Sequence, residues 1–313
     1  MSLDNSPLAE RMRPKSLDDY VGQEHIIGPG TALRSFIESG RLPSLILWGP
    51  PGVGKTTLAQ IIAETLDRPF HTLSAINSGV KDVREVIDKA KNQGLFGGGK
   101  SPILFIDEIH RFSKSQQDSL LHAVEQGIVT LIGATTENPS FEVISALLSR
   151  CQVYTLESLS KSHLEALLNR ALVQDSYLKS KKIHLDETNA LLRLSGGDGR
   201  KLLNSLELVV QSQSDKKSIK ITNALVTEQV MRNPANYDKN GEQHYDIVSA
   251  FIKSIRGSDP NGAMYWLAVM IEGGEDLKFI ARRLLISASE DIGNANPTAL
   301  IMANNCFQAV SQV

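Results

Sequence analysis

The fold of this chain is decided by one stretch, Gly49-Pro50-Pro51-Gly52-Val53-Gly54-Lys55-Thr56. It fits the phosphate-loop pattern G-x-x-x-x-G-K-[ST] at every fixed position. The apolar run Leu45 to Trp48 precedes it and predicts a buried strand, and apolar residues follow it at helical spacing. The alternative, a glycine-rich turn that happens to contain a lysine, accounts for the loop but not for both flanks.

A strand, a glycine loop and a helix N-terminus in this order form a binding site for phosphate groups. Glycines let backbone N–H groups turn toward phosphate oxygens, and the helix dipole adds partial positive charge at the same point. We expect Lys55 to reach the β- and γ-phosphates and the Thr56 hydroxyl to bind Mg²⁺. The predicted nucleotide-binding residues of this segment are Gly49, Pro50, Pro51, Gly52, Val53, Gly54, Lys55, Thr56 and Thr57.

The composition bounds the class of protein. The 313 residues are enough for two or three domains, and 41% hydrophobic with 22% charged residues is ordinary for a soluble globular protein. No stretch approaches the ~20 apolar residues of a membrane span, and the N-terminus lacks a secretory-signal pattern. Cys151 and Cys306 lie far apart in the chain, which indicates a reducing compartment and argues against a disulfide framework or a cysteine zinc site.

Charge and histidine spacing exclude two further classes. The histidines are scattered without paired spacing, so a protein-held transition metal is not expected. The formal net charge of −2 excludes a protein whose whole surface binds nucleic acid. Any DNA contact therefore needs a local basic face, or a channel that forms on assembly.

Apolar runs alternate with amphipathic segments from residue 1 to about 156. This alternation predicts an α/β domain with a parallel sheet and helices on both faces. The expected strands are 45–48, Phe70–Leu73, Ile103–Ile106, Val129–Ile132 and Val153–Leu156, and the expected helices are 56–66, 81–93 and 115–126. A loop is expected over 96–102, where glycines and a proline interrupt any apolar period.

From about residue 157 the apolar spacing becomes helical, and 157–235 is predicted to be a small helical domain. Two serines compete to cap its first helix: Ser162 with Glu165 fits a capping box, and Ser160 is the alternative. Further helices are expected over 186–195, ending at Gly196-Gly197, then after Asp198 and after Thr222.

Residues 236–313 are predicted to form a further all-α domain behind a polar linker at 233–242. Asp259-Pro260 and Asn296-Pro297 each place a capping residue before a proline at the first helical position. The last helix runs to Val310 without a glycine cap. We therefore expect either a fragment of a longer protein or a partner that covers this end.

Two acids end a second apolar run. Ile103 to Ile106 lead into Asp107 and Glu108, which predicts a buried strand with carboxylates at its C-terminal end. In a nucleotide hydrolase, Asp107 would position Mg²⁺ and Glu108 would act as general base toward the attacking water. Solvated acids at a strand end are the alternative. The phosphate loop about 50 residues earlier favours the hydrolase interpretation.

Three single residues carry open alternatives. Thr136 ends an apolar strand and could orient water or sense the γ-phosphate, or could only cap the strand. Arg150 follows the helix-like segment 141–148 and could be an arginine finger donated to a neighbouring subunit, or a cation at a helix C-terminus. Arg200 lies in the first turn of its helix, where a cation opposes the dipole unless a phosphate lies in front of it; pairing with a nearby acid is the alternative.

Basic side chains occur in short runs. Lys179, Lys181 and Lys182 form one run and Lys216 and Lys217 a second, and both are interpreted as solvated surface. Arg282-Arg283 lies on an apolar helix and is the better candidate for a nucleic-acid contact, although no stacking set of aromatic residues accompanies it.

The motifs together resemble those of AAA+ ATPases. Asp107-Glu108, Thr136, Arg150 and Arg200 match the Walker B acids, sensor 1, the arginine finger that acts in trans and sensor 2. Ser149-Arg150-Cys151 resembles the S-R-C box of clamp-loader subunits, and 197–204 resembles their sensor-2 helix. Pro14 to Gly30 resembles the box that holds adenine in this superfamily, which adds Val21 and Gly22 to the implied nucleotide site.

Four stretches are similar to the RarA/MgsA family of the clamp-loader clade, to which the Werner-helicase-interacting protein is related. They are 46–52, 109–112, 133–141 and 288–293. The resemblance covers nearly the whole chain. It implies a P-loop AAA+ core over 1–156, a helical lid over 157–235, a helical oligomerisation domain over 236–313, and ATP with Mg²⁺ as cofactors.

The resemblance also implies partners and a function. The partners are DNA at forks, ends, gaps and single-strand/duplex junctions, single-strand-binding protein, and further copies of the chain in a tetramer, in a cytoplasmic, nucleoid-associated setting. The predicted function is a DNA-dependent ATPase acting in replication-fork maintenance, recombination and repair. The alternatives are a clamp-loader-like subunit, a Holliday-junction-type motor and an ATP-switched DNA-binding scaffold. Helices after residue 240 argue against the motor, and Glu108 argues against the scaffold.

Overall fold

The computed structural model describes residues 6–75, 80–97, 100–213, 216, 218–231, 242–272 and 275–312. The chain divides into two compact units, Met1–Thr227 and Glu228–Val313, and each is described by itself. The first unit contains the sheet predicted from the sequence together with most of the helical segment after it. The predicted boundaries at 156 and 235 stay predictions.

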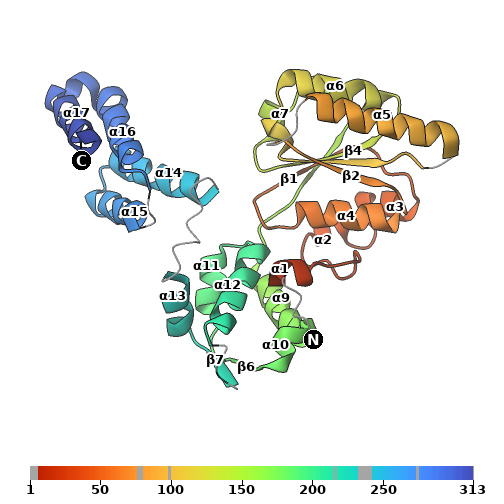
Figure 1. Ribbon diagram of the computed structural model, residues 1–313, viewed down its shortest axis with the longest axis horizontal. Helices are drawn as coiled ribbons and strands as arrows, with labels where there is room; N and C mark the ends of the chain where they lie inside the picture. The colour runs from red at the N-terminus through yellow and green to blue at the C-terminus, as the bar shows by residue number, and fades with distance from the viewer. Residues whose placement is uncertain are drawn as a thin grey trace. The chain divides into compact units, whose positions relative to one another are not determined.

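A five-stranded parallel sheet forms the centre of the first unit, in the order β2-β3-β4-β1-β5. The strands are β1 Leu45–Trp48, β2 Phe70–Ser74, β3 Ile103–Asp107, β4 Thr130–Thr135 and β5 Gln152–Thr155. Helices cover both faces, α2, α3 and α4 on one and α5 and α6 on the other (Figure 1). They run over α2 Glu24–Ile27, α3 Ala32–Glu38, α4 Lys55–Thr65, α5 Val80–Gly97 and α6 Lys114–Glu125, and the short α7 Pro139–Glu142 and α8 Ser145–Leu148 precede β5.

Two apolar clusters hold the helices to the sheet. Alternate strand residues face opposite sides, so Leu45 and Leu47 pack with α4 in one cluster while Ile46 packs with α6 in the other. Strands buried on both faces are nearly all apolar, as the sequence runs predicted. Gly133 of β4 gives Ile46 its space, because a Cβ at this position would lie 2.8 Å from Ile46 Cδ1 and that side chain would have to shift.

Two predicted boundaries are wrong. Strand β4 continues to Thr135 instead of ending at Ile132, because Gly133 to Thr135 pair in register with β1. Helix α5 reaches Gly97, so the predicted loop over 96–102 starts within a helix; residues 98 and 99 lie outside the described residues. A glycine costs a helix only about 1 kcal/mol relative to alanine, which does not by itself end it.

The lid helices of the first unit follow the sheet. They are α9 Lys161–Gln174, α10 Ser176–Ser180, α11 Asn189–Ser195, α12 Gly199–Gln211 and α13 Asn223–Met231, and the N-terminal α1 Leu8–Arg11 packs on α12. The expectation of a wholly helical lid misses one feature, a parallel pair of β6 Lys182–Leu185 with β7 Ser218–Ile221. Each strand is only four residues long, and its alternation of polar and apolar residues is too short to stand out in the sequence.

The cap of α9 corrects a second expectation. Ser160, not Ser162, is the N-cap, because its hydroxyl accepts from His163 N at 3.2 Å. His163 Nδ1 accepts in return from Ser160 N at 3.4 Å. The box is therefore closed by a histidine in the place where glutamate or glutamine is usual.

The second unit consists of helices. They are α14 Glu242–Arg256, α15 Pro260–Glu272, α16 Leu277–Ser287, the π-helical η3 Ala288–Ile292, the short η4 Gly293–Ala295 and α17 Pro297–Gln312. Its core contains Val248, Phe251, Met270 and Ile280. Both predicted caps are confirmed, since Asp259 Oδ1 accepts from Gly262 N at 3.0 Å and Asn296 Oδ1 from Thr298 N at 3.2 Å. No helix within the described ranges is long and apolar enough to cross a membrane.

Candidate nucleotide site

The phosphate loop leaves the sheet at its topological switch point. Strand β1 lies between β4 and β5, while the chain after it crosses to the far edge at β2. Ligands of open parallel sheets bind at such a point, outside the carboxyl ends of the strands. Asp107 and Thr135 end the two strands next in order, so the acids and the loop meet at one edge of the sheet.

Two glycines of the loop cannot be replaced. Gly52 has φ 68° and Gly54 has φ 98°, both in the left-handed region. A Cβ at Gly52 would lie 1.8 Å from Asp198 Oδ1, and a Cβ at Gly54 would lie 2.3 Å from Tyr20 Oη. The loop is therefore packed against the start of α12 on one side and the N-terminal segment on the other.

Lys55 begins α4 and is 7% exposed. Its ammonium donates to Gly49 O at 2.6 Å and to Pro50 O at 3.0 Å, which holds it inside the loop. Thr56 and Thr57 follow in the first turn of the same helix, where backbone N–H groups have no partner within the helix. The geometry is that of a site for an anion.

Asp107 ends β3 and Glu108 follows it, and their pKa values are shifted in opposite directions. Burial and the neighbouring charge of Glu108 raise the pKa of Asp107, while Lys55 and Arg200 act in the other direction. Burial also acts to raise the pKa of Glu108, but the His110 hydrogen bond and the charge of Lys55 outweigh it and lower that pKa. Lys55, Glu108 and Arg200, predicted from separate motifs, thus all act electrostatically on Asp107.

One carboxylate oxygen of Glu108 takes all of its described contacts. Oε2 accepts from Thr136 N at 3.3 Å and from Thr136 Oγ1 at 3.2 Å, and His110 Nδ1 lies 3.1 Å away. Glu108 itself has φ 51°, an uncommon conformation for a residue with a side chain. The side chain is therefore turned toward the end of β4, where it meets Thr136.

His110 is a site residue that sequence reasoning quoted only as part of a family motif. Its Nδ1 also lies 3.0 Å from Thr135 Oγ1. The Thr135 hydroxyl donates to Glu137 O, so its single hydrogen is used and it can only accept from His110. The network therefore assigns the hydrogen to Nδ1, and His110 donates toward both Thr135 and Glu108.

Helix α12 brings Arg200 to the loop. Asp198 caps this helix by accepting from Lys201 N at 2.9 Å, and Gly199 N donates to Gly52 O at 3.2 Å. Arg200 is the next residue and lines a cavity beside the loop. An anion bound at this point would lie in front of the N-terminus of α12 as well as that of α4.

The cavity has a volume of about 360 Å³, within the range of small-molecule sites. Its walls come from the phosphate loop, the lid and the N-terminal segment; the side chains of Met12, Tyr20, Val21, Leu159, Leu167 and Leu203 are among them. Tyr20 donates its hydroxyl to Val53 O at 2.8 Å. Gly22 packs closely against Leu159 of this wall: it has φ 80°, and a Cβ at this position would lie only 2.9 Å from Leu159 Cδ2. The sequence pointed to Val21 and Gly22 but not to the lid leucines, whose spacing predicts only a core face.

Arg150 is placed apart from these residues. It forms an ion pair with Glu125 of α6 and donates to Ala146 O at 2.6 Å and Ser149 Oγ at 2.9 Å. These described partners all lie on α6 and α8, not on the phosphate loop. Burial raises the pKa of the neighbouring Cys151 thiol to about 12, which keeps it protonated and unreactive.

Comparisons with known proteins agree with this geometry. Three family profiles match: the ATPase family associated with various cellular activities (AAA) over 45–159, an AAA C-terminal domain over 179–256, and the MgsA AAA+ ATPase C-terminal domain over 257–313. A phosphate loop at this switch point, two acids at the end of β3 and a lid that places Arg200 beside the loop agree with the AAA profile and define an AAA+ ATPase, an enzyme that hydrolyses ATP.

Similar proteins narrow this class. The chain is 46% identical to replication-associated recombination protein A of Haemophilus influenzae over 99% of this chain and 70% of that protein. It is 44% identical to the ATPase WRNIP1 of Dictyostelium discoideum over 97% of this chain and 37% of that protein. The chain belongs to the RarA/MgsA family of AAA+ ATPases, which confirms the resemblance of its motifs.

A solved structure gives the fold relationship. The RuvB Holliday junction branch migration motor of Thermotoga maritima superposes with a TM-score of 0.61 at 29% identity. The match covers 78% of this chain and 80% of that structure. It confirms the expected parallel-sheet AAA+ fold with helical parts after it.

Proposed function

We propose that the protein is a DNA-dependent ATPase that acts in replication-fork maintenance, recombination and repair. The observation that carries the proposal is the convergence of Lys55, Asp107, Glu108, Thr136 and Arg200 at one edge of the sheet. The names of the most similar relatives, replication-associated recombination protein A among them, support the biological setting.

The phosphate loop and the cavity would hold ATP. The backbone of Gly49 to Gly54 and the ammonium of Lys55 would face the phosphates, and the cavity near Val21 would take the base. Thr56 and Asp107 offer a hydroxyl and a carboxylate, the hard oxygen donors that Mg²⁺ prefers, so this pair fits the metal. When bound, Mg²⁺ neutralises charge on the phosphates. A cation there would also relieve the repulsion from Glu108 that raises the pKa of Asp107.

Hydrolysis would be performed by the residues around Glu108. With its Oε2 fixed by Thr136 and His110, Glu108 can accept the proton of the attacking water at Oε1. Its lowered pKa keeps it ionised at neutral pH, as a base must be. Thr136 would report on the γ-phosphate from β4, and Arg200 from the lid, so the lid would respond to hydrolysis.

The direct test of the nucleotide assignment is Lys55→Ala, with ATP binding and turnover measured beside the wild type. Loss of both at unchanged stability supports the proposal, and wild-type hydrolysis contradicts it. The DNA dependence is tested by the ATPase rate with duplex, gapped and forked DNA. A rate that none of these DNAs changes contradicts a DNA-dependent enzyme while leaving the ATPase intact.

Arg150 is proposed to act in trans on a neighbouring subunit's ATP. Its position at α8, exposed and paired with Glu125, supports a role outside its own site. Arg150→Ala subunits mixed with Glu108→Gln subunits should recover part of the activity. A contact in which the Glu108→Gln subunit donates its Arg150 to the ATP of the Arg150→Ala subunit restores one complete site. Confirmed mixed oligomers without recovery would refute action in trans.

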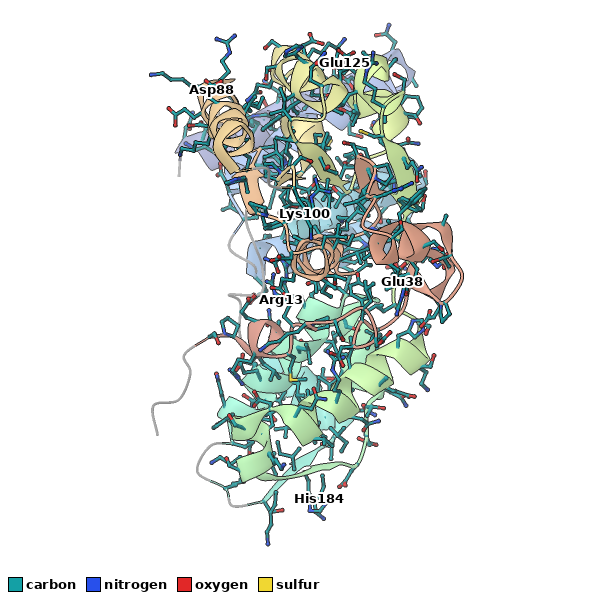
Figure 2. The ribbon with its side chains drawn as sticks, turned by 90° about the vertical axis from the view of Figure 1, so that its right-hand side faces the viewer. Arg13, Glu38, Asp88, Lys100, Glu125 and His184 are labelled. Atoms are coloured by element: carbon teal, nitrogen blue, oxygen red, sulfur yellow. The ribbon has the colours of Figure 1, made fainter. Side chains whose placement is uncertain are left out.

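A basic face on the lid supports contact with DNA. Pairing of β6 with β7 sets Lys182 beside Ser218 and His184 beside Lys220, all exposed. His184 points away from the ribbon at the end of the lid (Figure 2). Lys182, from a run that the sequence indicated only as solvated surface, thus shares a face with His184 and Lys220. In the double variant Lys182→Glu with Lys220→Glu, the slope of log affinity for DNA against log salt concentration should become shallower by about 0.9 per lost phosphate contact. The double variant Lys81→Glu with Lys89→Glu on α5 should keep the wild-type slope.

Assembly into a homo-oligomer, a tetramer in the full-length form, is also proposed. The second unit exposes several large apolar side chains on α15 and α17, among them Met264 at 65%, Tyr265 at 59% and Met302 at 69%. Exposed apolar surface of this kind marks protein contacts. The mass in solution tests this, and Met302→Glu should lower it. Contact with single-strand-binding protein and association with the nucleoid are proposed from the family alone.

A Holliday-junction motor is the second candidate, favoured by the likeness to RuvB. The MgsA-type C-terminal domain over 257–313 disfavours it. Branch migration of a synthetic junction that requires Glu108 would establish the motor.

A further inference from the structure

We infer that Arg11 is a positioning residue for ATP binding: it fastens residues 6–20, here called the N-terminal segment, to the lid, so that one wall of the nucleotide cavity belongs to the lid. The inference rests on the proposed assignment of the cavity to the nucleotide. Arg11 does not line that cavity, and it acts through the residues that follow it.

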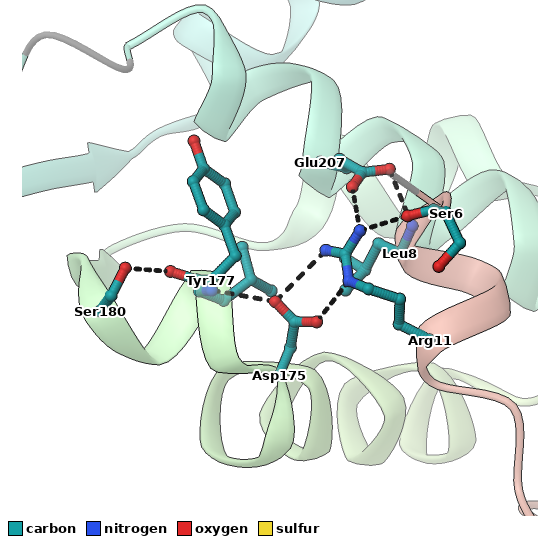
Figure 3. Close-up of polar contacts among 8 residues, drawn as sticks. Ser6, Leu8, Arg11, Asp175, Tyr177, Ser180 and Glu207 are labelled. Carbon is teal, nitrogen blue, oxygen red and sulfur yellow. Dashed lines mark hydrogen bonds and ion pairs between the residues drawn. The ribbon is translucent and has the colours of Figure 1, made fainter. Parts of the chain in front are cut away.

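The guanidinium of Arg11 joins two lid helices (Figure 3). Its Nε donates to Asp175 Oδ2 at 2.7 Å and its Nη2 to Asp175 Oδ1 at 3.3 Å. Its Nη1 donates to Glu207 Oε1 at 2.9 Å and also to Ser6 O. Asp175 lies between α9 and α10 and Glu207 on α12, so one side chain connects the segment to both.

Both acids are largely shielded from solvent and are held by further hydrogen bonds. The side chain of Asp175 is 2% exposed and that of Glu207 13%. Asp175 also caps α10 by accepting from Leu178 N at 2.9 Å, and Glu207 Oε2 accepts from Leu8 N at 2.8 Å. Removal of Arg11 would leave a buried carboxylate, Asp175, and a partly buried one, Glu207, without their cation, which costs more than the loss of a surface pair.

A second lid arginine holds the other end of the segment. Arg170 of α9 donates to Met12 O at 3.0 Å and to Asp19 O. The segment contributes Met12, Arg13, Pro14 and Tyr20 to the cavity wall. Its contacts with the sheet domain include the Tyr20 hydroxyl on Val53 O, at the phosphate loop, and hydrogen bonds from Arg13 to Gln60 of α4 and from Arg34 of α3 to Asp18.

The segment depends on these attachments for its shape. Helix α1 has only four residues, too few to form alone, so its conformation comes from its contacts. With Arg11 in place, Met12 and Pro14 are set against the lid before a nucleotide arrives. Without Arg11, the wall becomes ordered only when the ligand binds, and the entropy lost in this ordering weakens the binding free energy. The reacting groups at Lys55 and Glu108 are untouched, so the effect falls on affinity.

The test compares Arg11→Ala with Arg11→Lys and Glu207→Gln. Arg256→Ala is the control, because Arg256 also pairs with an acid, Asp291, but in the second unit and with its side chain 55% exposed. The measurements are the Kd for a fluorescent ATP analogue, the KM and kcat for ATP, and the thermal midpoint. We expect Kd and KM to rise at least tenfold in Arg11→Ala with kcat within about twofold, a smaller rise in Glu207→Gln, partial recovery in Arg11→Lys and no change in Arg256→Ala.

Two results would overturn the inference. One is a folded Arg11→Ala protein that binds the analogue as the wild type does. The other is a fall in kcat with unchanged KM. If Arg11→Ala fails to fold, an unchanged Kd in both Arg11→Lys and Glu207→Gln overturns it instead. Failure of the underlying assignment has a different signature, which is wild-type nucleotide binding by Lys55→Ala.

Discussion

His110→Ala is the sharpest probe of the hydrolytic site, because it removes one donor from Glu108 without touching the phosphate loop. In the wild type, Glu108 Oε2 receives Thr136 N–H, Thr136 O–H and His110 Nδ1–H. The two threonine donors remain in the variant, so the carboxylate stays in the site but loses one of the three contacts that hold Oε2. A hydrogen bond to a charged group contributes about 1.5–3 kcal/mol, and the lower end applies where other donors remain.

An energy of about 1.5 kcal/mol corresponds to about a tenfold fall in kcat. The assay is steady-state ATP turnover together with nucleotide affinity. We expect kcat to fall about tenfold and Kd to stay within twofold, since His110 does not line the cavity. His110→Asn should recover much of the rate, because an amide N–H can replace Nδ1–H. His122→Ala, an exposed histidine on α6, is the control. An unchanged kcat, or a loss that appears only in Kd, would refute the reasoning.

Three further predictions follow from contacts of the described residues. Gly52→Ala should abolish ATP binding measured by calorimetry, since its φ of 68° costs about 1–2 kcal/mol for alanine and the new Cβ would overlap Asp198; retained affinity would show that the loop can move away from α12. Asp175→Asn should destabilise the protein at neutral pH, and the difference in unfolding free energy from the wild type should shrink as the pH falls below about 4. Burial acts to raise the pKa of Asp175, but the Arg11 hydrogen bond and the Leu178 N–H outweigh it and hold the pKa below its ordinary value. The stabilisation is therefore present above the pKa of the unfolded state and is lost as the pH falls through the pKa of the folded state. A difference that does not change with pH in denaturant titrations would contradict this. Ser160→Ala should cost about 1 kcal/mol of stability and Ser162→Ala close to none, because Ser160 caps α9; the reverse order in thermal melts would restore the capping box predicted at Ser162.

The sequence was most informative where function requires a fixed local pattern. The phosphate loop, the strand that ends in Asp107-Glu108 and the Asp198 cap of α12 are each contained in fewer than ten residues, and each lies where its pattern predicts. The chemistry of such a motif depends on backbone geometry and neighbouring residues in the chain. At α9 the usual capping-box pattern pointed to Ser162, whereas Ser160 is the cap, because His163 closes the box and histidine is not part of that pattern.

Contacts between distant segments were not readable in advance. The sequence offered no reason to join Arg11 to Asp175 and Glu207, because a pair separated by more than 160 residues leaves no local pattern. The parallel pairing of β6 with β7 was hidden for the same reason. The contact of His110 with Glu108 accompanies a left-handed conformation of Glu108 that the sequence did not indicate.

The sequence by itself predicted a phosphate-binding loop at Gly49 to Thr56, on a parallel sheet with acids at the end of another strand. Glycine conformation, a helix N-terminus and a buried apolar strand are local properties, so residue order is sufficient to specify them. Only the tertiary structure decided what surrounds that loop: which lid residues close the cavity, which oxygen of Glu108 is held, and that the chain's N-terminal segment is fastened to its lid. These depend on packing between segments far apart in the chain, and a linear pattern does not encode which surfaces will meet.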